Sequence, residues 1–297
     1  MKITIRWVLT VLMLLALALT VSSPALAEVK PLDLDQTVPG RPAQAGGWIS
    51  ENEYEDESMH VTVRHDKVGK VKTSIVDITI EDPSQIRTAM SEDSYDKTSY
   101  VKATVLAKHV NAIAAVNGDF FKYYDYGYLI RQGVKYREAD SKKHPRDVLL
   151  IDDQGDFYGV SNATEESMAA FMAELPKERS IINTFSLGPV LIRNGELQEI
   201  TTRDFQYRYK MQRVGIVQLG KLHYAIVEAD GKADASSGMS IKEFGEYIQK
   251  EFPDALLAYN LDGGGSTNVI VNGKRIHKNP DARNICDILY FASAVGE

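Results

Sequence analysis

The sequence predicts an α+β fold, a single domain with a mixed, largely antiparallel sheet and several flanking helices. Segments with strand-like alternation outnumber segments with helical spacing. Hairpin signals also outnumber the strand–helix–strand crossovers that a parallel sheet requires. No repeat or internal linker follows about residue 60, and 297 residues are enough for one large core. One domain is therefore the economical prediction.

The first predicted strands follow residue 59. Apolar residues alternate from His60, and residues 71–80 continue the sheet-like pattern. Residues 101–111 place apolar side chains at helical spacing and lead directly into the apolar run 112–116. This order predicts a helix followed by a buried strand.

The middle of the chain predicts a hairpin and a surface helix. Residues 147–151 and 157–160 flank the turn sequence Asp153-Gln154-Gly155-Asp156. Residues 164–175 then repeat apolar side chains at the spacing of one helix face.

Further strands and one helix are predicted towards the C-terminus. Ser240-Ile241-Lys242-Glu243 forms a capping box, which predicts the start of a helix. Asn272-Gly273 is a strong hairpin signal within residues 269–276. The remaining predicted strands are residues 189–192, 214–219, 223–228 and the apolar run 255–261.

The N-terminus predicts export. Residues 1–27 combine Lys2 and Arg6, an uncharged apolar stretch and an Ala25-Leu26-Ala27 cleavage sequence, as secretory signals do. The apolar stretch is short for a spanning helix, so we expect no stable membrane span after cleavage, with an uncleaved anchor as the alternative. Residues 28–58 are expected to form an extended or partly disordered lead-in, and residues 59–297 the domain. The expected location is secreted or extracytoplasmic.

Charge and cysteine content exclude several classes of protein. The formal charge of −7 argues against a surface that binds nucleic acid or anionic lipid. Cys286 is the single cysteine, so no intramolecular disulfide can form. Its neighbours are apolar, and we expect a buried side chain rather than a nucleophile.

The most informative motif follows the apolar run 255–261. Asp262 is followed by Gly263, Gly264 and Gly265, and then by Ser266. Glycines let the backbone adopt positive φ and approach a ligand closely, and successive N–H groups in such a turn can bind an anion. The alternative is an ordinary glycine-rich hairpin loop.

Other polar clusters also follow apolar runs. Each cluster also has a purely structural interpretation. The Asn-Gly sequence can form a turn that places the two phenylalanines in the core, and most arginines are solvated surface residues or salt-bridge partners. Arginine also presents a planar fork suited to phosphate. The clusters are Asn117-Gly118-Asp119-Phe120-Phe121, Ser186-Leu187-Gly188-Pro189, Arg213-Val214-Gly215, Glu228-Ala229-Asp230-Gly231 and Arg283-Asn284-Ile285-Cys286-Asp287.

Several common catalytic motifs are missing from the sequence. It contains no G-x-S-x-G, H-E-x-x-H or C-x-x-C motif, and the triple glycine lacks the Lys-Ser/Thr of a phosphate-binding loop. We therefore expect no cofactor and no catalytic metal. A structural Ca²⁺ stays open, although no twelve-residue EF-type loop is present.

The order of these motifs, together with Ser237-Gly238-Met239-Ser240, resembles the phosphodiester glycosidase family over roughly residues 100–292. Bacterial members are commonly exported and are often described as exopolysaccharide-related. The sequence departs from the family in three places: Asp119 stands where many members have a second glycine, Thr267 where a second serine is usual, and Glu228-Ala229 where two aliphatic residues precede Asp-Gly.

The resemblance implies a hydrolase that cleaves the C1–O bond of a sugar-1-phosphodiester in cell-envelope or exopolysaccharide metabolism. The implied partner is a carbohydrate phosphodiester. Asp262 and Asp119 are the first candidates for catalytic carboxylates, with Glu228 and Asp230 as alternatives. Substrate binding is assigned to Asn117, Gly118, Arg213, Gly263, Gly264, Gly265, Ser266, Thr267 and Arg283, with Arg213, Arg283 and the glycine loop on the phosphate.

Two other functions remain open on the sequence. One is a non-catalytic envelope module that binds phosphorylated glycans through the same glycine loop and aromatic side chains. The other is an exopolysaccharide or wall-polymer assembly factor that acts on a lipid-linked sugar phosphate.

Overall fold

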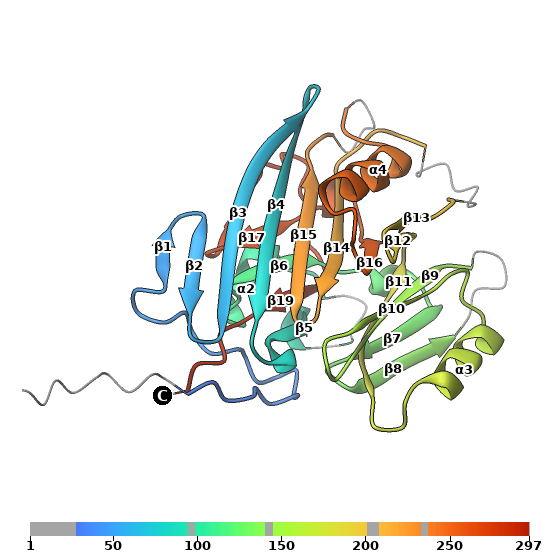
Figure 1. Cartoon of the computed structure of the whole chain (residues 1–297), viewed down its shortest axis with the longest axis horizontal. Coiled ribbons are helices and arrows are strands. Elements are labelled where there is room, and N and C mark those ends of the chain that lie inside the picture. Colours follow the sequence, from blue (N-terminus) through green and yellow to red (C-terminus); the bar gives the residue numbers. More distant parts are fainter. Residues whose placement is uncertain are drawn as a thin grey trace, which may run out of the picture.

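The computed structural model describes residues 28–93, 95, 99–139, 145–200, 208–232 and 237–296 (Figure 1). The predicted signal, residues 1–27, lies outside the described residues. Within them the strands form four sheets, and every pairing between strands is antiparallel.

The largest sheet has nine strands. Its long central strands alternate between two apolar faces, each of which is covered by other elements. In spatial order the strands are β1 (Trp48–Ser50), β2 (Glu53–Asp56), β3 (Met59–Val68), β4 (Val71–Ile80), β15 (His223–Ala229), β14 (Arg213–Gly220), β16 (Leu257–Asn260), β12 (Val190–Arg193) and β13 (Glu196–Leu197).

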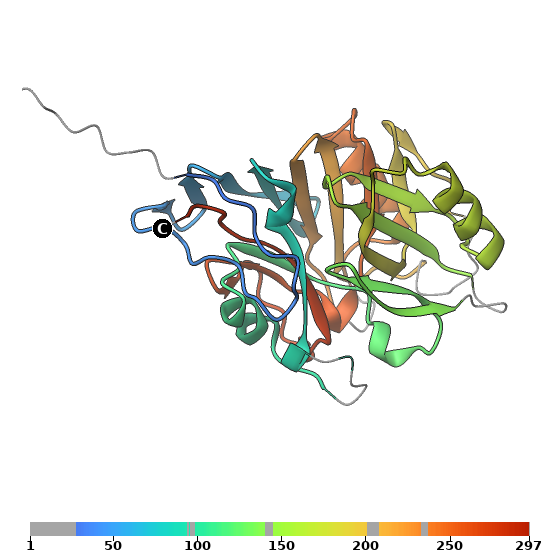
Figure 2. The same ribbon diagram turned by 90° about the horizontal axis from the view of Figure 1, so that it is seen from below.

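A five-stranded sheet packs against one face of the nine-stranded sheet (Figures 1 and 2). Side chains such as Ile78 and Ile226 meet Val116 and Leu289 there in the main core. The strands are, in spatial order, β18 (Lys274–Arg275), β17 (Val269–Val271), β6 (Ala114–Asn117), β19 (Asp287–Phe291) and β5 (Ile86–Met90).

Two smaller sheets complete the β-structure. The three-stranded sheet β10 (Phe157–Val160), β9 (Asp147–Asp152) and β11 (Ile181–Leu187) adds Leu149 and Phe185 to the main core. The hairpin of β7 (Gly127–Arg131) and β8 (Val134–Ala139) lies beside it in Figure 1.

Three α-helices within the described residues cover the outer faces. α2 (Ala103–His109) packs on the five-stranded sheet, and α4 (Ile241–Glu251) on the second face of the nine-stranded sheet. α3 (Glu165–Glu174) packs near β9 and β10. Short 3-10 helices are η1 (Pro83–Gln85), η2 (Ser91–Asp93), η3 (Phe121–Tyr123) and η5 (Gly264–Ser266).

Most locally encoded predictions are confirmed. β9 pairs with β10, β14 with β15 and β17 with β18 as hairpins. The Ser240 capping box is present, with Ser240 Oγ accepting from the N–H of Glu243. No helix of the described residues is long and apolar enough to cross a membrane.

Three expectations differ from the structure. The strands form several sheets with purely antiparallel pairing in the described ranges, rather than one mixed sheet, and the helices are few. The lead-in 28–58 contains β1 and β2, which extend the nine-stranded sheet. Tyr54 is fully buried there, with its hydroxyl donating to Asp56 at 2.6 Å. The apolar positions of residues 28–58 are too few to produce a periodic signal, so the two strands in this segment depend on long-range pairing with β3.

Candidate active site

The two most informative motifs meet where β6 and β16 end. β6 belongs to the five-stranded sheet and β16 to the nine-stranded sheet, so the site lies where the two sheets come together. The Asp262 N–H donates to the Gly118 carbonyl at 3.2 Å. The Asn117 amide donates to the Asp262 carbonyl at 2.8 Å. Residues 117 and 262, distant in the sequence, are thus neighbours.

Asn117 holds both ends of the glycine loop. Its Nδ2 donates to the carbonyl of Asp262, and its Oδ1 accepts from the N–H of Asn268 at 2.9 Å. The side chain is almost fully buried. Asn117 therefore has its polar atoms occupied by the protein, which makes it a clamp on the loop.

The glycine loop is a short 3-10 turn, η5. The N–H of Gly264 donates to Gln212, and that of Ser266 donates to Gly263, so these two amides are not available to an anion. A Cβ at Gly263 would lie 2.8 Å from the Gln212 carbonyl. A Cβ at Gly265 would lie 2.9 Å from Arg283 Nε. The glycines therefore allow close packing, in particular the approach of Arg283.

Asp262 carries a carboxylate oxygen that no described residue satisfies. Its Oδ2 is buried and has no hydrogen-bond partner in the part of the chain that the structure describes. Burial raises the pKa of Asp262 to about 6, although a hydrogen bond from Ser266 and the charge of Arg283 act in the opposite direction. A raised pKa and an unoccupied oxygen are typical of a functional carboxylate.

Arg283 lies beside this carboxylate and is exposed. Its Nη2 donates to Ser266 Oγ at 2.9 Å, and its N–H donates to the Gly265 carbonyl at 2.8 Å. The guanidinium also lies 5.5 Å from the centre of the Phe120 ring. Backbone, hydroxyl and ring together fix an accessible cation beside Asp262.

Asp119 belongs to a different, fully buried cluster. Its Oδ1 accepts from Arg131 at 3.1 Å and its Oδ2 from the N–H of Ser186 at 2.6 Å. Arg131 also donates to Asp287 at 2.6 Å. A Cβ at Gly118 would lie 2.4 Å from the Asp287 carboxylate, so Gly118 makes room for this cluster.

Arg131 lies beside the candidate site and was not among the residues predicted from the sequence. It is wholly buried and is stacked over Phe185, with its guanidinium 4.3 Å from the ring centre. The sequence does contain one signal for a buried arginine: Arg131 directly follows the apolar residues Tyr128-Leu129-Ile130. An arginine is rarely buried unless an acid pairs with it.

Aromatic rings form one side of the site. Phe120 adopts a left-handed φ of 63°, and its ring stacks on that of Tyr123 at 5.0 Å. Tyr123 is exposed, and the ring of Tyr124 stands nearly perpendicular to it at 5.0 Å. Phe121 points instead into a buried cluster with Leu129 and Cys286. The two phenylalanines of the motif therefore have separate roles.

The remaining predicted site residues are either buried behind the glycine loop or lie elsewhere. Arg213 is buried and donates to the carbonyls of Met239 and Tyr209 at 3.0 and 2.8 Å. Thr267 is fully buried behind the glycine loop. Glu228 is buried under the influence of Asp230 and Arg275, not of the groups that act on Asp262. Arg213 nevertheless lies beside the glycine loop, since a Cβ at Gly263 would be 3.8 Å from its Nη1, and the Thr267 N–H donates to Gly264. The structure thus sets only Glu228 and Asp230 apart from the other predicted site residues, which are Asn117, Gly118, Asp119, Arg213, Asp262, the three glycines, Ser266, Thr267 and Arg283.

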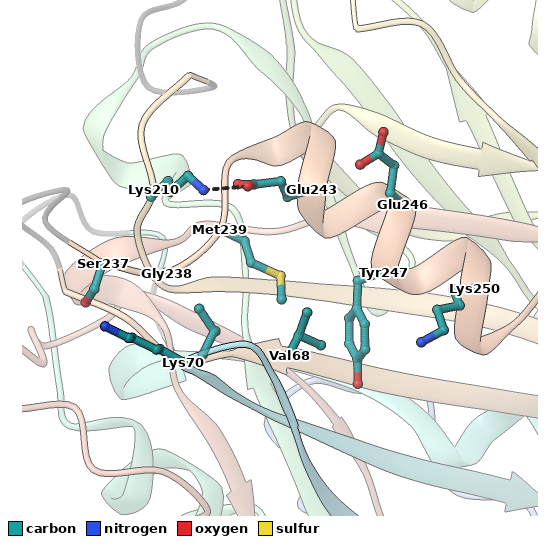
Figure 3. Close-up of a pocket in the computed structure, with 11 residues that line it drawn as sticks. Val68, Lys70, Lys210, Ser237, Gly238, Met239, Glu243, Glu246, Tyr247 and Lys250 are labelled. Atoms are coloured by element: carbon teal, nitrogen blue, oxygen red, sulfur yellow. Dashed lines mark hydrogen bonds and ion pairs between the residues drawn. The ribbon is translucent and has the colours of Figure 1, made fainter.

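A separate cavity of about 550 Å³ lies between the β3–β4 turn and α4 (Figure 3). Val68, Met239 and Tyr247 line it, and Lys210 pairs with Glu243 at its rim at 2.5 Å. None of the predicted site residues lines it. Among the described residues, no group of three or more His, Cys, Asp or Glu side chains is arranged to hold a metal ion.

Comparison with solved structures shows the fold. The catalytic domain of zebrafish N-acetylglucosamine-1-phosphodiester alpha-N-acetylglucosaminidase, auto-inhibited by its pro-peptide, matches with a TM-score of 0.62 at 16% identity. The match covers 90% of this chain and 99% of that one. A hypothetical protein from Synechocystis matches with a TM-score of 0.53 at 13% identity, over 79% of this chain and 62% of that one.

Sequence comparison gives the family. The protein YomE of Bacillus subtilis strain 168, described as SPbeta prophage-derived and uncharacterized, is 25% identical over 213 residues. The match covers 67% of this chain but 32% of YomE, so the chain spans about a third of the length of that relative. The phosphodiester glycosidase family model matches residues 110–292, more than half of the chain. The chain therefore belongs to the phosphodiester glycosidase family.

Proposed function

We propose that this chain is a hydrolase that cleaves the glycosidic C1–O bond of a sugar-1-phosphodiester. One observation carries the proposal: a buried oxygen of Asp262 lacks a hydrogen-bond partner within the described residues and lies beside the exposed cation Arg283. A carboxylate beside a cation suits a substrate that is cationic at C1 in the transition state and anionic at phosphate. Family membership supports the same reaction.

The reaction depends more on a cation that stabilises the leaving phosphate than on an acid that protonates it. Water supplies OH to C1 and a proton to phosphate, which gives a free sugar and a phosphomonoester. The phosphomonoester leaves as a stabilised anion, so little protonation of the leaving oxygen is needed. We assign the phosphate to the Arg283 guanidinium, whose planar fork matches two phosphate oxygens.

We assign the anomeric centre to Asp262. With its pKa near 6, this carboxyl is mostly ionised at neutral pH and can stabilise or attack a cationic C1. Asp119 has both oxygens occupied by Arg131 and Ser186, so we assign it to positioning. The exposed ring of Tyr123, continuous with Phe120 beside Arg283, offers a face for the sugar.

Hydrolysis of a panel of sugar-1-phosphodiesters tests the proposal. Free sugar and phosphomonoester would be quantified together for the wild type and for Asp262→Asn. We expect both products in equal amounts, and a loss of turnover of at least about 1,000-fold in the variant. The control is Asp254→Asn, which changes an exposed aspartate before β16 and should leave turnover unchanged.

Other outcomes would contradict the assignment. Near-normal turnover in folded Asp262→Asn would remove Asp262 from the reaction. Saturable binding without release of sugar would favour the envelope-module function, and release from lipid-linked substrates alone would favour the assembly factor.

We also propose that the chain is exported and acts in cell-envelope or exopolysaccharide metabolism. The support is the signal sequence predicted in residues 1–27. N-terminal sequencing of the protein recovered outside the cytoplasm should begin at Glu28. Recovery only inside the cell, with Met1 intact, would contradict export.

A further inference from the structure

The segment that carries Arg283 crosses the surface between β18 and β19, and we call residues 276–284 the strap. Most of its side chains are exposed, but His277 is largely buried and Asn279 is buried. Asn279 donates to the carbonyl of Thr267 at 3.0 Å and accepts from Gln212 at 3.2 Å. Ile276 packs against the main core. The polar side chains that hold the strap to the molecule are Asn279 and His277.

His277 meets a row of polar residues on the nine-stranded sheet. His65 on β3, Ser74 on β4 and Glu228 on β15 occupy paired positions on neighbouring strands, which lie side by side in Figure 1. His277 Nε2 lies 2.9 Å from Ser74 Oγ. Ser74 Oγ in turn lies 2.6 Å from Nδ1 of His65, which is exposed.

The other imidazole nitrogen faces Glu228. His277 Nδ1 and Glu228 Oε2 are 3.6 Å apart, and the two side chains are 10% and 2% exposed. Neither atom has a hydrogen-bond partner within the described residues. Two buried polar atoms that face each other can satisfy each other when one proton lies between them.

We propose that Glu228 and His277 share one proton that docks the strap, and that this pair thereby positions Arg283 beside Asp262. The inference rests on the proposed phosphate-binding role of Arg283. In this state the Glu228 carboxyl and His277 Nδ1 approach from 3.6 Å to hydrogen-bond distance, and the carboxyl donates to Nδ1. His277 Nε2–H then donates to Ser74, and Ser74 donates to His65. Each donor in the row then has one acceptor.

The charges around the pair support a single shared proton. Burial and the neighbouring Asp230 raise the pKa of Glu228 to about 8, against the opposing charge of Arg275. Burial lowers the pKa of His277, with Lys72 and His65 acting in the same direction and Asp230 against it. At neutral pH the carboxyl is therefore protonated and the imidazole is neutral.

Loss of that proton would loosen the strap. Ionised Glu228 would be a buried negative charge beside Asp230, and such charges are costly unless they gain water or a cation. Opening of the strap admits water and moves Arg283 away from Ser266. Phosphate binding should therefore weaken above about pH 8, where Glu228 ionises.

Hydrogen exchange tests the anchor without any substrate. The strap amides of Ala282 and Arg283 donate to Asn279 and Gly265, so they report its docking. Their protection, corrected for the intrinsic pH dependence of exchange, would be compared at pH 6.5 and pH 9.0. We expect protection in the wild type to fall by about tenfold at pH 9.0, and to stay constant in Glu228→Gln, whose amide always donates.

Matched variants make this test decisive. Glu55→Gln changes an exposed glutamate on β2 and should behave as the wild type. Asp230→Asn removes the charge that favours protonation of Glu228, so the loss of protection should move to lower pH. Protection that is independent of pH in the wild type, or equal pH dependence in Glu228→Gln, would overturn the proposal.

Kinetics then separate positioning from a merely structural role. For the wild type, KM should rise about tenfold from pH 6.5 to pH 9.0 with kcat nearly constant, and Glu228→Gln should abolish the rise. If exchange shows the pH effect but no sugar-1-phosphodiester is hydrolysed, the proposed function fails and the proton-dependent anchor stands. If KM is flat while turnover is present, the coupling to Arg283 is wrong.

Discussion

Two groups of buried carboxylates lie next to each other where β6 and β16 end, and they are satisfied differently. Asp119 and Asp287 both pair with Arg131, at 3.1 and 2.6 Å, and Arg131 is wholly buried. Asp262 has an oxygen without a partner in the described residues, and its nearest cation, Arg283, is exposed. The same residue type is therefore neutralised by the fold in one place and left reactive in the other.

The difference separates stability from function. A buried acid with a buried cation recovers part of the cost of its desolvation, and the pair links the strands that carry it. Burial raises the pKa of Asp287 to about 6 against the charge of Arg131, as it does that of Asp262. Asp262 is distinguished by an oxygen without a partner in the described residues and by an exposed cation, which suit a site where charge develops during a reaction. Gly118 contacts both groups, since its carbonyl accepts from the Asp262 N–H and a Cβ there would reach the Asp287 carboxylate.

Removal of the buried cation should have the largest effect on stability. In Arg131→Met, Asp119 and Asp287 lose their shared partner, so we expect a loss of about 3–5 kcal/mol in the free energy of unfolding. Urea denaturation measures it. The matched control is Lys135→Met, because Lys135 and Glu138 pair at 2.6 Å on the exposed surface and should contribute at most about 0.5 kcal/mol. Equal losses in the two variants would refute the contrast between buried and exposed pairs.

A change at the exposed cation should affect catalysis instead. Arg283→Lys keeps the charge but loses the planar fork, so kcat/KM for a sugar-1-phosphodiester should fall by about 10- to 100-fold. Steady-state kinetics measure this, and urea denaturation should show an unfolding free energy within about 0.5 kcal/mol of the wild type. Unchanged kcat/KM would show that another group binds the phosphate.

Replacement of Asp262 should stabilise the inactive protein. The pKa of Asp262 is raised from 3.8 to about 6 by folding, so its stabilising contribution is present below pH 3.8 and is lost as the pH rises through 6. Asp262→Asn avoids that loss, and we expect a gain of about 1–2 kcal/mol at pH 7.5 that shrinks towards pH 4.5.

The neighbouring aspartate gives the opposite expectation. Asp119→Asn removes a charged partner of Arg131 and should destabilise by about 1–3 kcal/mol at pH 7.5. Thermal unfolding at both pH values compares the two variants. If both destabilise to the same extent, Asp262 is satisfied in a way that the structure does not show.

The hairpins and the capped helix were predictable because their signals are local. Asn272-Gly273 and Asp153-Gln154-Gly155-Asp156 specify turns through a few adjacent residues, and the Ser240 capping box does so for α4. β1 and β2 were not predictable in this way. They are ordered by pairing with β3, and Tyr54 is buried by contacts that have no counterpart in a short apolar pattern.

The residues of the site could also be identified from the sequence, but the role of each residue could not. Asn117, Asp119, Asp262 and Arg283 stand out in the sequence beside glycines and apolar runs. Nothing in the spacing of the chain reveals that Arg131, on β7, neutralises Asp119 and Asp287, or that Asp230 and His277 lie around Glu228. Ion pairing and desolvation depend on distances between remote segments, and these follow only from the packed sheets.

The sequence alone determined the order of the motifs, the family they resemble, the α+β class and the local turns. Each of these depends on patterns among residues that are close together in the chain. Which carboxylate is paired and which stays open follows only from tertiary packing. The reason is that the free energy of a buried charge depends on the charges and hydrogen-bond donors around it in space. At this site β6, β7, β16 and β19 supply these groups from separate parts of the chain.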